Sequence, residues 1–436
     1  MFAGYTKAYR KVVMAVRAPS LENSIWLNHA PLSKKDLEGK IILLDFFTYG
    51  CMNCLNVLAD LKTLQKEFAD KLLVIGIHSG KHLHEKEEDA VKEAMQFYNI
   101  DHIVINDFDM KLWDVYGIKA WPSLVLIDAK GYVISQYQGE GHLDELRKDI
   151  KALSSKTQTK NFVPKKNEHV KGLLYYPQKI HASKDYLFIS HRDEVLVCSY
   201  EGTVLHKIQG LREPQGLVYV EGVLYIALRE GNSIIEVSKN FSQCSVYLEG
   251  LRNPYDLECD GDVLYVALAG SHQIKAYDLK SKKEILVIGQ ENSESLHDGV
   301  FDEAVLAQPS GLSLLEEELW FVDSESSSLR CAYNEEVKSY IYDNEELQHP
   351  LDIVAGQYGD GCGGGRIFIC DSYNNRVKVY NPQSNEVMTL VEGLNQPSGI
   401  SKKACNLYIC NTNSHEIIVF DLSQMQSTVL SLKENS

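Results

Sequence analysis

Up to about residue 153, the chain alternates between short apolar runs and segments whose apolar residues recur at helical spacing. This pattern predicts strands at 41–47, 72–78, 103–106, 123–128 and 131–137, and helices at 54–69, 86–98, 109–116 and 142–153. Such alternation is typical of an α/β layer fold with a mainly parallel central sheet. The segment Asp128-Ala-Lys-Gly131 predicts a hairpin turn between the last two strands.

Beyond about residue 169 the pattern changes to a repeat of short apolar strands separated by polar turns. Each repeat begins at a proline, and these are Pro177, Pro214, Pro254, Pro309, Pro350 and Pro397. Their spacing suits four strands per repeat, and so small a sheet cannot bury its own faces. We therefore predict that six repeats stack radially as the blades of an all-β propeller. The longest interval, after Pro254, predicts an insertion around 290–300.

A chain of 436 residues is too long for one ordinary domain, so we expect two or more. The patterns above indicate where their boundaries lie. We expect an N-terminal arm at 1–20, an α/β domain at 21–153 and a propeller at 169–436. Residues 154–168 are polar and aperiodic, which predicts a linker.

Charge and apolar content exclude some classes of partner. The formal net charge is −16, and most of the excess acid lies in the repeats, so binding to nucleic acid or to an anionic membrane surface is not expected. No apolar run approaches the ~20 residues of a membrane helix. Ten cysteines without a secretion signal predict a reducing compartment and free thiols. Cys370 and Cys410 fit buried core positions, and Cys362 and Cys405 show no pairing pattern.

The candidate chemistry lies in Cys51-Met-Asn-Cys54, which follows the predicted strand 41–47 and opens the first predicted helix. Backbone N–H groups at a helix N-terminus favour a thiolate, so Cys51 is placed to attack disulfides. A Cys-x-x-Cys is also half of a common zinc site, but no second pair lies at the spacing of such a site, and we interpret His78, His82 and His84 as loop histidines. We therefore expect neither a metal nor a cofactor beyond the two thiols.

Three features of this first part together resemble the thioredoxin-like fold, in the subgroup of TlpA-type thiol oxidoreductases. These are the two cysteines, Asp45 six residues before Cys51, and Trp121-Pro122 before a strand. The resemblance implies that Asp45 is a buried acid that takes the proton of Cys54. It also implies a cis proline at Pro122, with Trp121 and Pro122 facing the substrate.

The chain departs from the thioredoxin pattern at three places. Gly50 stands where tryptophan precedes the first cysteine, Met52-Asn53 replaces Gly-Pro, and Ala59 replaces the helix-kinking proline. The first two departures alter the substrate-facing surface and the redox poise, but no reacting atom is lost.

The repeats resemble the NHL type. Ser271-His-Gln-Ile274, Asn374-Asn-Arg-Val377 and Ser414-His-Glu-Ile417 lie near the place of its Asn-His-Leu signature. A thioredoxin-like domain fused to a six-bladed NHL propeller resembles the NHL repeat-containing protein 2 family, as do the segments 44–54, 308–314 and 347–350. This resemblance implies a cytoplasmic location. Some NHL-like propellers are metal-dependent lyases, but His272, His349 and His415 form no evident set.

Two functions remain open from the sequence. The first is a thiol–disulfide oxidoreductase in which Cys51 attacks, Cys54 resolves and the propeller docks protein substrates. The second is a non-catalytic adaptor that binds protein partners through the propeller, with the first domain as a scaffold or redox sensor. The sequence does not determine the oligomeric state.

Overall fold

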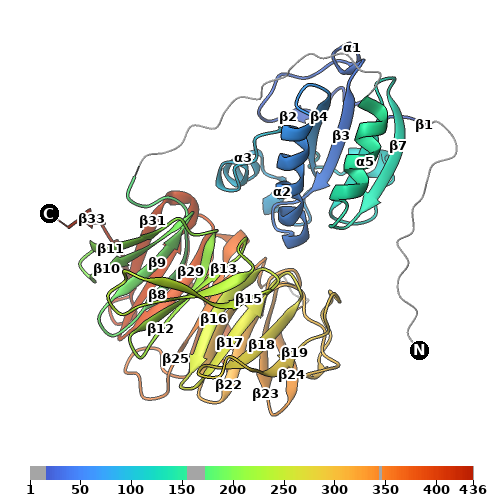
Figure 1. Ribbon diagram of the computed structural model, residues 1–436. Helices are drawn as coiled ribbons and strands as arrows, with labels where there is room; N and C mark the ends of the chain where they lie inside the picture. The colour runs from blue at the N-terminus through green and yellow to red at the C-terminus, as the bar shows by residue number, and fades with distance from the viewer. Residues whose placement is uncertain (1–15, 155–171, 343–345, 436) are drawn as a thin grey trace. The chain divides into compact units, whose positions relative to one another are not determined.

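The computed structural model describes residues 16–154, 172–342 and 346–435 (Figure 1). Its internal contacts divide the chain into two compact units, 1–169 and 170–436. Most of the expected arm, residues 1–15, and nearly all of the expected linker, residues 155–168, lie outside the described residues. Within the described ranges, no helix is long and apolar enough to cross a membrane.

The first unit is a seven-stranded sheet in the order β1-β7-β6-β3-β4-β5-β2, with helices on its faces. Its elements are β1 (Val16–Arg17), β2 (Ile25–Trp26), α1 (Lys34–Leu37), β3 (Ile41–Phe47), α2 (Met52–Glu67), β4 (Leu72–His78), η1 (His84–Lys86), α3 (Glu88–Phe97), β5 (Ile103–Asn106), α4 (Lys111–Val115), β6 (Ser123–Ile127), β7 (Tyr132–Gln138) and α5 (Leu143–Ser154).

The expectation of a mainly parallel sheet is wrong. Only β3, β4 and β5 run parallel to one another, and the other four pairings are antiparallel. The physical reason lies partly in the turn Asp128–Gly131, where the Gly131 N–H donates to the Asp128 carbonyl at 2.9 Å. So short a connection can join β6 to β7 only as an antiparallel hairpin.

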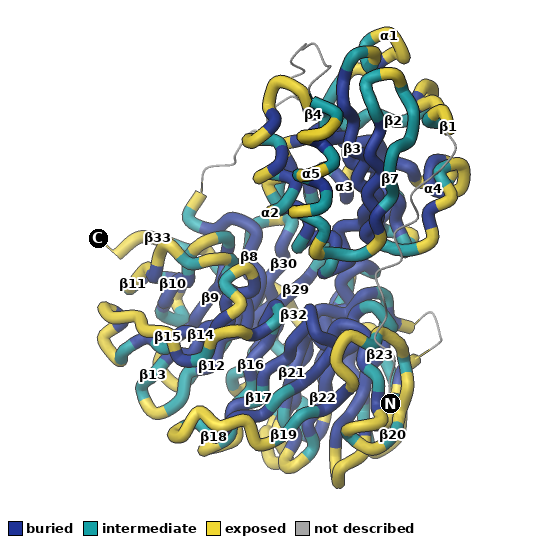
Figure 2. Tube along the Cα trace, turned by 45° about the vertical axis from the view of Figure 1, so that its right-hand side comes forward, coloured by how far each residue is buried: buried dark blue, intermediate teal, exposed yellow. Residues whose placement is uncertain are grey.

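β3 lies at the centre of this unit, and all seven of its residues are buried (Figure 2). Its side chains alternate between the two faces of the sheet, because the period of a strand is two residues. Ile42, Leu44 and Phe46 join the apolar cluster of one face. Asp45 therefore points to the other face, where α2 and α5 contact each other and both contact the sheet.

The second unit is a ring of six antiparallel sheets, which confirms the predicted six-bladed propeller. The first three blades are β8 (Pro177–Ala182), β9 (Leu187–His191), β10 (Glu194–Cys198) and β11 (Thr203–Gln209); β12 (Pro214–Val220), β13 (Val223–Leu228), β14 (Ser233–Val237) and β15 (Cys244–Glu249); and β16 (Pro254–Asp260), β17 (Val263–Leu268), β18 (Gln273–Asp278) and β19 (Glu284–Ile288).

The last three blades are β21 (Pro309–Leu315), β22 (Glu318–Asp323), β23 (Ser328–Tyr333) and β24 (Glu336–Ile341), with β20 (Gly299–Val300) at their edge; β25 (Asp352–Gly356), β26 (Arg366–Asp371), η2 (Ser372–Asn374), β27 (Arg376–Asn381) and β28 (Glu386–Val391); and β29 (Pro397–Lys403), β30 (Asn406–Asn411), η3 (Thr412–Ser414), β31 (Glu416–Asp421) and β32 (Gln426–Val429). The short β33 (Lys433–Glu434) adds to the outer strand of the first blade.

Five of the six predicted prolines begin an innermost strand, and Pro350 lies two residues before β25. The predicted insertion is also present, since β20 lies between β19 and β21 and pairs with β24. Arg330 binds the backbone on both sides of this insertion. Its guanidinium is fully buried beside Asp323 at 2.9 Å, and it donates to the carbonyls of His297 and Val305 at 2.8 and 2.9 Å.

The expectation that the cysteines outside the Cys-x-x-Cys are free thiols is wrong for two of them. Cys362, in the loop before β26, forms a disulfide with Cys405, in the turn between β29 and β30. The two residues belong to neighbouring blades and are 43 positions apart in the sequence. Their proximity depends on how the blades stack, so no local sequence pattern could indicate it.

The second residue after each repeat proline alternates around the ring between a charged residue and glycine. Blades one, three and five carry Lys179, Asp256 and Asp352, while blades two, four and six carry Gly216, Gly311 and Gly399. Each glycine lies against the charged residue of the next blade. A Cβ at Gly216 would lie 2.5 Å from the Cα of Asp256, and one at Gly311 would lie 2.6 Å from that of Asp352.

Gly399→Ala is expected to lower the free energy of unfolding by about 1–3 kcal/mol. A Cβ at Gly399 would lie 2.4 Å from the carbonyl oxygen of Gln178, so the last blade must shift from the first where the ring closes. Urea unfolding measures the loss. Gly361→Ala is the matched control, because no atom lies within 4 Å of the added Cβ. An equal effect of the two substitutions would contradict the argument.

Candidate thiol–disulfide site

The two cysteines lie at the junction between β3 and α2. Cys51 is the N-cap residue of α2, with extended backbone angles, and its carbonyl accepts the N–H groups of Cys54 and Leu55 at 3.1 Å each. Both cysteines are unpaired thiols. Both are buried, with Cys51 6% exposed and Cys54 fully buried, so Cys51 is the more accessible of the two.

Their surroundings separate the chemical roles of the two thiols. Burial raises the pKa of Cys54 well above its usual range, and the hydrogen bond to Cys51 raises it further. A hydrogen bond that stabilises the protonated Cys54 has its S–H as donor and the Cys51 sulfur as acceptor. Cys54 therefore holds its proton in the resting state and directs it towards Cys51.

Asp45 is the buried acid next to this pair. It is fully buried in β3, and neither carboxyl oxygen has a hydrogen-bond partner among the described residues. Burial raises the pKa of Asp45 to about 8, and its negative charge in turn raises the pKa of Cys54. The carboxyl group is therefore mostly protonated at pH 7, and it changes protonation state close to neutral pH.

Trp121 and Pro122 lie at the same edge of the sheet as the cysteines. The Trp121–Pro122 peptide bond is cis, and the next residue, Ser123, pairs with Phe46 near the end of β3. The Trp121 indole N–H donates to the carbonyl of Ser79 at 2.9 Å, and its ring lies 4.1 Å from that of Trp113. The indole is half-buried in this fixed position, so one part of its surface remains open.

Sequence reasoning missed the buried histidine behind the cysteines. His78 was expected in a loop, but it ends β4 and is fully buried. Its ring stacks on Tyr49 at 5.2 Å, and Nε2 accepts the Tyr49 N–H at 3.4 Å. Burial lowers the pKa of His78 to about 4, so the imidazole is neutral and orients the 48–50 turn. The apolar run that leads directly into His78 was the available signal.

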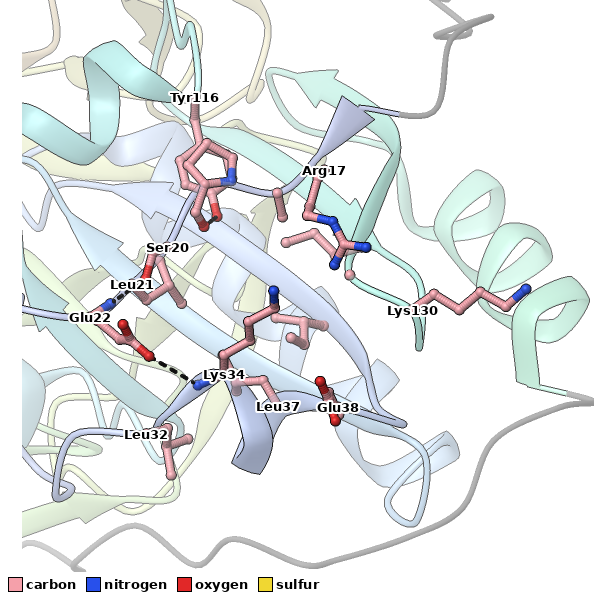
Figure 3. A pocket seen from close by; sticks show the side chains of 15 residues that line it. Arg17, Ser20, Leu21, Glu22, Leu32, Lys34, Leu37, Glu38, Tyr116 and Lys130 are labelled. Carbon is pink, nitrogen blue, oxygen red and sulfur yellow. Dashed lines mark hydrogen bonds between the residues drawn. The ribbon is translucent and has the colours of Figure 1, made fainter.

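A pocket of about 160 Å³ lies at the opposite end of β3 (Figure 3). Its floor is apolar, with Leu21, Leu32 and Leu37 among its residues, and Arg17 and Lys34 lie at its rim. It also includes Ile42 and Ile127, which pair across β3 and β6 at the end away from Cys51. This pocket therefore does not belong to the cysteine site.

Known proteins share both parts of this chain. Residues 39–133 match the family described as Thioredoxin-like. NHL repeat-containing protein 2 of Gallus gallus is 30% identical, with 93% of this chain and 70% of that protein covered. Protein SUPPRESSOR OF QUENCHING 1, chloroplastic, of Arabidopsis thaliana is 30% identical over 99% of this chain, which spans 49% of that protein.

Similarity limited to the first unit extends to a named oxidoreductase. Thiol-disulfide oxidoreductase ResA of Bacillus cereus is 23% identical, with 35% of this chain and 86% of that protein covered. The match to the Gallus gallus protein, by contrast, runs through both the thioredoxin-like unit and the propeller. From this match and the shared architecture, the chain belongs to the NHL repeat-containing protein 2 family.

Proposed function

We propose that the protein is a thiol–disulfide oxidoreductase. The observation that carries the proposal is the buried Cys54, which is hydrogen-bonded to the more accessible Cys51 and lies next to a protonatable Asp45. The similarity of the first unit to ResA supports it. A structural Cys-x-x-Cys would need none of these three features.

The reaction proceeds through two exchanges of sulfur. The Cys51 thiolate attacks one sulfur of a substrate disulfide, forms a mixed disulfide and releases the other sulfur as a thiolate, which takes a proton from water. In the minority of molecules in which Asp45 is ionised at pH 7, Cys54 then gives its proton to the Asp45 carboxylate and attacks the Cys51 sulfur. This attack releases the second substrate sulfur as a thiolate, which takes the proton from Asp45. The substrate thus leaves as a dithiol, Asp45 is ionised again, and the protein keeps a Cys51–Cys54 disulfide. An external dithiol reductant returns it to the starting state.

Trp121 and Pro122 take the role of substrate contacts in this proposal. Both lie at the sheet edge where β3 ends, and the Pro122 carbonyl is already engaged by the Gly139 N–H at 2.9 Å. The half-buried Trp121 ring, with the Lys81 ammonium 5.2 Å from its centre, offers a surface for an apolar substrate side chain. We assign the docking of the protein substrate to the propeller, and we place the reaction in the cytosol.

Cys54→Ser is expected to accumulate a mixed disulfide with a substrate, because the serine hydroxyl cannot release Cys51. The reduced variant is mixed with insulin as the disulfide substrate, and the adduct is measured by intact mass. Cys51→Ser should form no adduct at this site. Cys244→Ser is the matched control, since Cys244 is an exposed thiol on the propeller.

The control variant should reduce insulin at the wild-type rate. If the Cys54→Ser variant forms no adduct, or if Cys51→Ser reduces insulin as the wild type does, the oxidoreductase proposal is wrong. The adaptor function would then account better for the thioredoxin-like unit.

A further inference from the structure

The propeller contains a cavity of about 380 Å³ at one end of its central channel, within the range of small-molecule sites. Its floor consists of the three charged residues that alternate with glycine around the ring. The Lys179 ammonium lies 3.2 Å from Asp256 and 2.7 Å from Asp352, and all three side chains are buried. The exposed residues of the lining are Asp260, Glu316 and Gln357, so the cavity, called the cup below, opens on their side and is closed on the side of the buried triad.

The lining of the cup is acidic. Its lining includes five residues with carboxyl groups, Asp256, Glu258, Asp260, Glu316 and Asp352, and two lysines, Lys179 and Lys402. Lys179 is shared by two of the carboxyl groups, and Lys402 pairs with Asp360 at 2.7 Å. Among the described residues, Glu258, Asp260 and Glu316 have no cationic partner.

Several backbone N–H groups of the cavity walls already donate hydrogen bonds to side-chain oxygens. The N–H groups of Leu312, Leu314 and Ile400 donate to Asp256, Glu258 and Asp352 at 2.8, 3.4 and 2.8 Å. Those of Ala182 and Ala355 donate to serine hydroxyls of neighbouring blades. An anionic ligand needs such donors and would find them used.

The histidine of the wall adds no positive charge. His181 Nε2 accepts the Tyr219 N–H at 3.3 Å, and burial lowers the pKa of His181 to about 4. Glu258 lies in the same wall, where its carboxyl oxygens accept the N–H groups of Cys259 at 2.8 Å and Leu314 at 3.4 Å, and burial raises the pKa of Glu258 to about 7. Asp260 and Glu316 are the exposed acidic residues of the lining. Residues with carboxyl groups therefore line both the exposed and the buried part of the cavity.

We propose that this cup binds a small organic cation whose ammonium or guanidinium group contacts Glu258. The site is independent of Cys51 and Cys54, and it gives the propeller a ligand of its own. The cation is either a free amine or the basic side chain of a protein partner, since both present the same group to the carboxylates.

Isothermal titration calorimetry of the full chain with agmatine tests the proposal. We expect saturable binding with a dissociation constant below about 1 mM, and none for the dianion glutarate. Glu258→Gln should weaken agmatine binding by about tenfold, through loss of one charge-assisted contact. Gln357→Lys places a positive charge at the exposed part of the cavity and should also weaken agmatine binding.

Glu249→Gln is the matched control. Glu249 lies on the exposed outer strand β15, so this substitution should leave agmatine binding unchanged.

A blocked peptide with one arginine separates the two sources of the cation. Tighter binding of the peptide than of agmatine indicates a protein partner, and binding of agmatine alone indicates a free amine. The proposal is overturned if neither cation binds, if glutarate binds equally well, or if both Glu258→Gln and Gln357→Lys bind agmatine as the wild type does. Gln357→Lys keeps the test valid even if Glu258→Gln does not fold.

Discussion

Replacing Lys179 with methionine is expected to lower the free energy of unfolding of the propeller by about 3–5 kcal/mol. The Lys179 side chain is 3% exposed, and its ammonium donates to the carbonyls of Ser310 and Leu351 as well as pairing with two aspartates. Its loss leaves Asp256 and Asp352 buried without the only cation that the described residues place beside both.

The loss should be larger at pH 8 than at pH 5. Burial already raises the pKa of Asp352, and Lys179 opposes this rise. Without Lys179, the two buried aspartates hold protons in the folded protein that they lose in the unfolded chain. The stability of the variant therefore falls as pH rises towards the raised pKa values of these aspartates. Urea unfolding at both pH values measures this difference, and hydrogen exchange of peptides from the propeller serves as the readout.

Two further variants separate charge from packing. Lys207→Met removes an ion pair with Glu434 that is open to solvent, and it should cost less than about 1 kcal/mol. Adding Asp256→Asn and Asp352→Asn to Lys179→Met should restore part of the lost stability, because each asparagine oxygen can still accept the N–H of Leu312 or Ile400. Equal losses in Lys179→Met and Lys207→Met would show that the triad does not stabilise the ring.

Local patterns predicted the elements but not these long-range pairs. The six-bladed ring follows from a repeat that can be read within each blade, starting with its proline. The Lys179 triad joins three blades, with Lys179 and Asp352 separated by 173 positions. A lysine at the third position of a strand has no distinguishing local signal, because its partners are identified only when the ring has closed.

More of the candidate site could be predicted, because its residues either lie close together in the sequence or are of an unusual type for their position. Cys51 and Cys54 lie within one turn of a helix, and Asp45 stands out as an acid inside an apolar run. The structure places Asp45 in the buried strand, next to the two cysteines. His78 was missed because a histidine at the end of an apolar run has the same sequence signature on a buried strand and at the start of a loop.

Asp45→Asn is expected to abolish most of the pH dependence of stability that this carboxyl group causes. The pKa of Asp45 in the folded protein, about 8, lies above its ordinary value of 3.8, so the native state binds more protons than the unfolded state between these limits. Wild-type stability therefore falls as pH rises through this window, by at most about 1.4 kcal/mol per pH unit.

Asparagine carries no charge at any pH, so the variant should be more stable than the wild type at pH 8, by about 5 kcal/mol, with little difference near pH 4. Urea unfolding between pH 4 and pH 8 measures this change. Asp70→Asn is the control, because Asp70 is exposed beyond the end of α2 and its substitution should leave the pH dependence unchanged. A wild-type slope in the Asp45→Asn variant would show that Asp45 ionises normally.

The same substitution should slow the release of substrate from the mixed disulfide. Cys54 cannot attack until it loses its proton, and Asp45 is the acid whose charge acts on that thiol. Removing a positioned base costs about 10²-fold or more in rate, so single-turnover release from Cys51 should fall by this factor at pH 7. The wild-type rate should rise with pH through the pKa of Asp45, about 8, and this inflection should be absent from the variant. A gain in stability without slower release would mean that water, and not Asp45, takes the proton of Cys54.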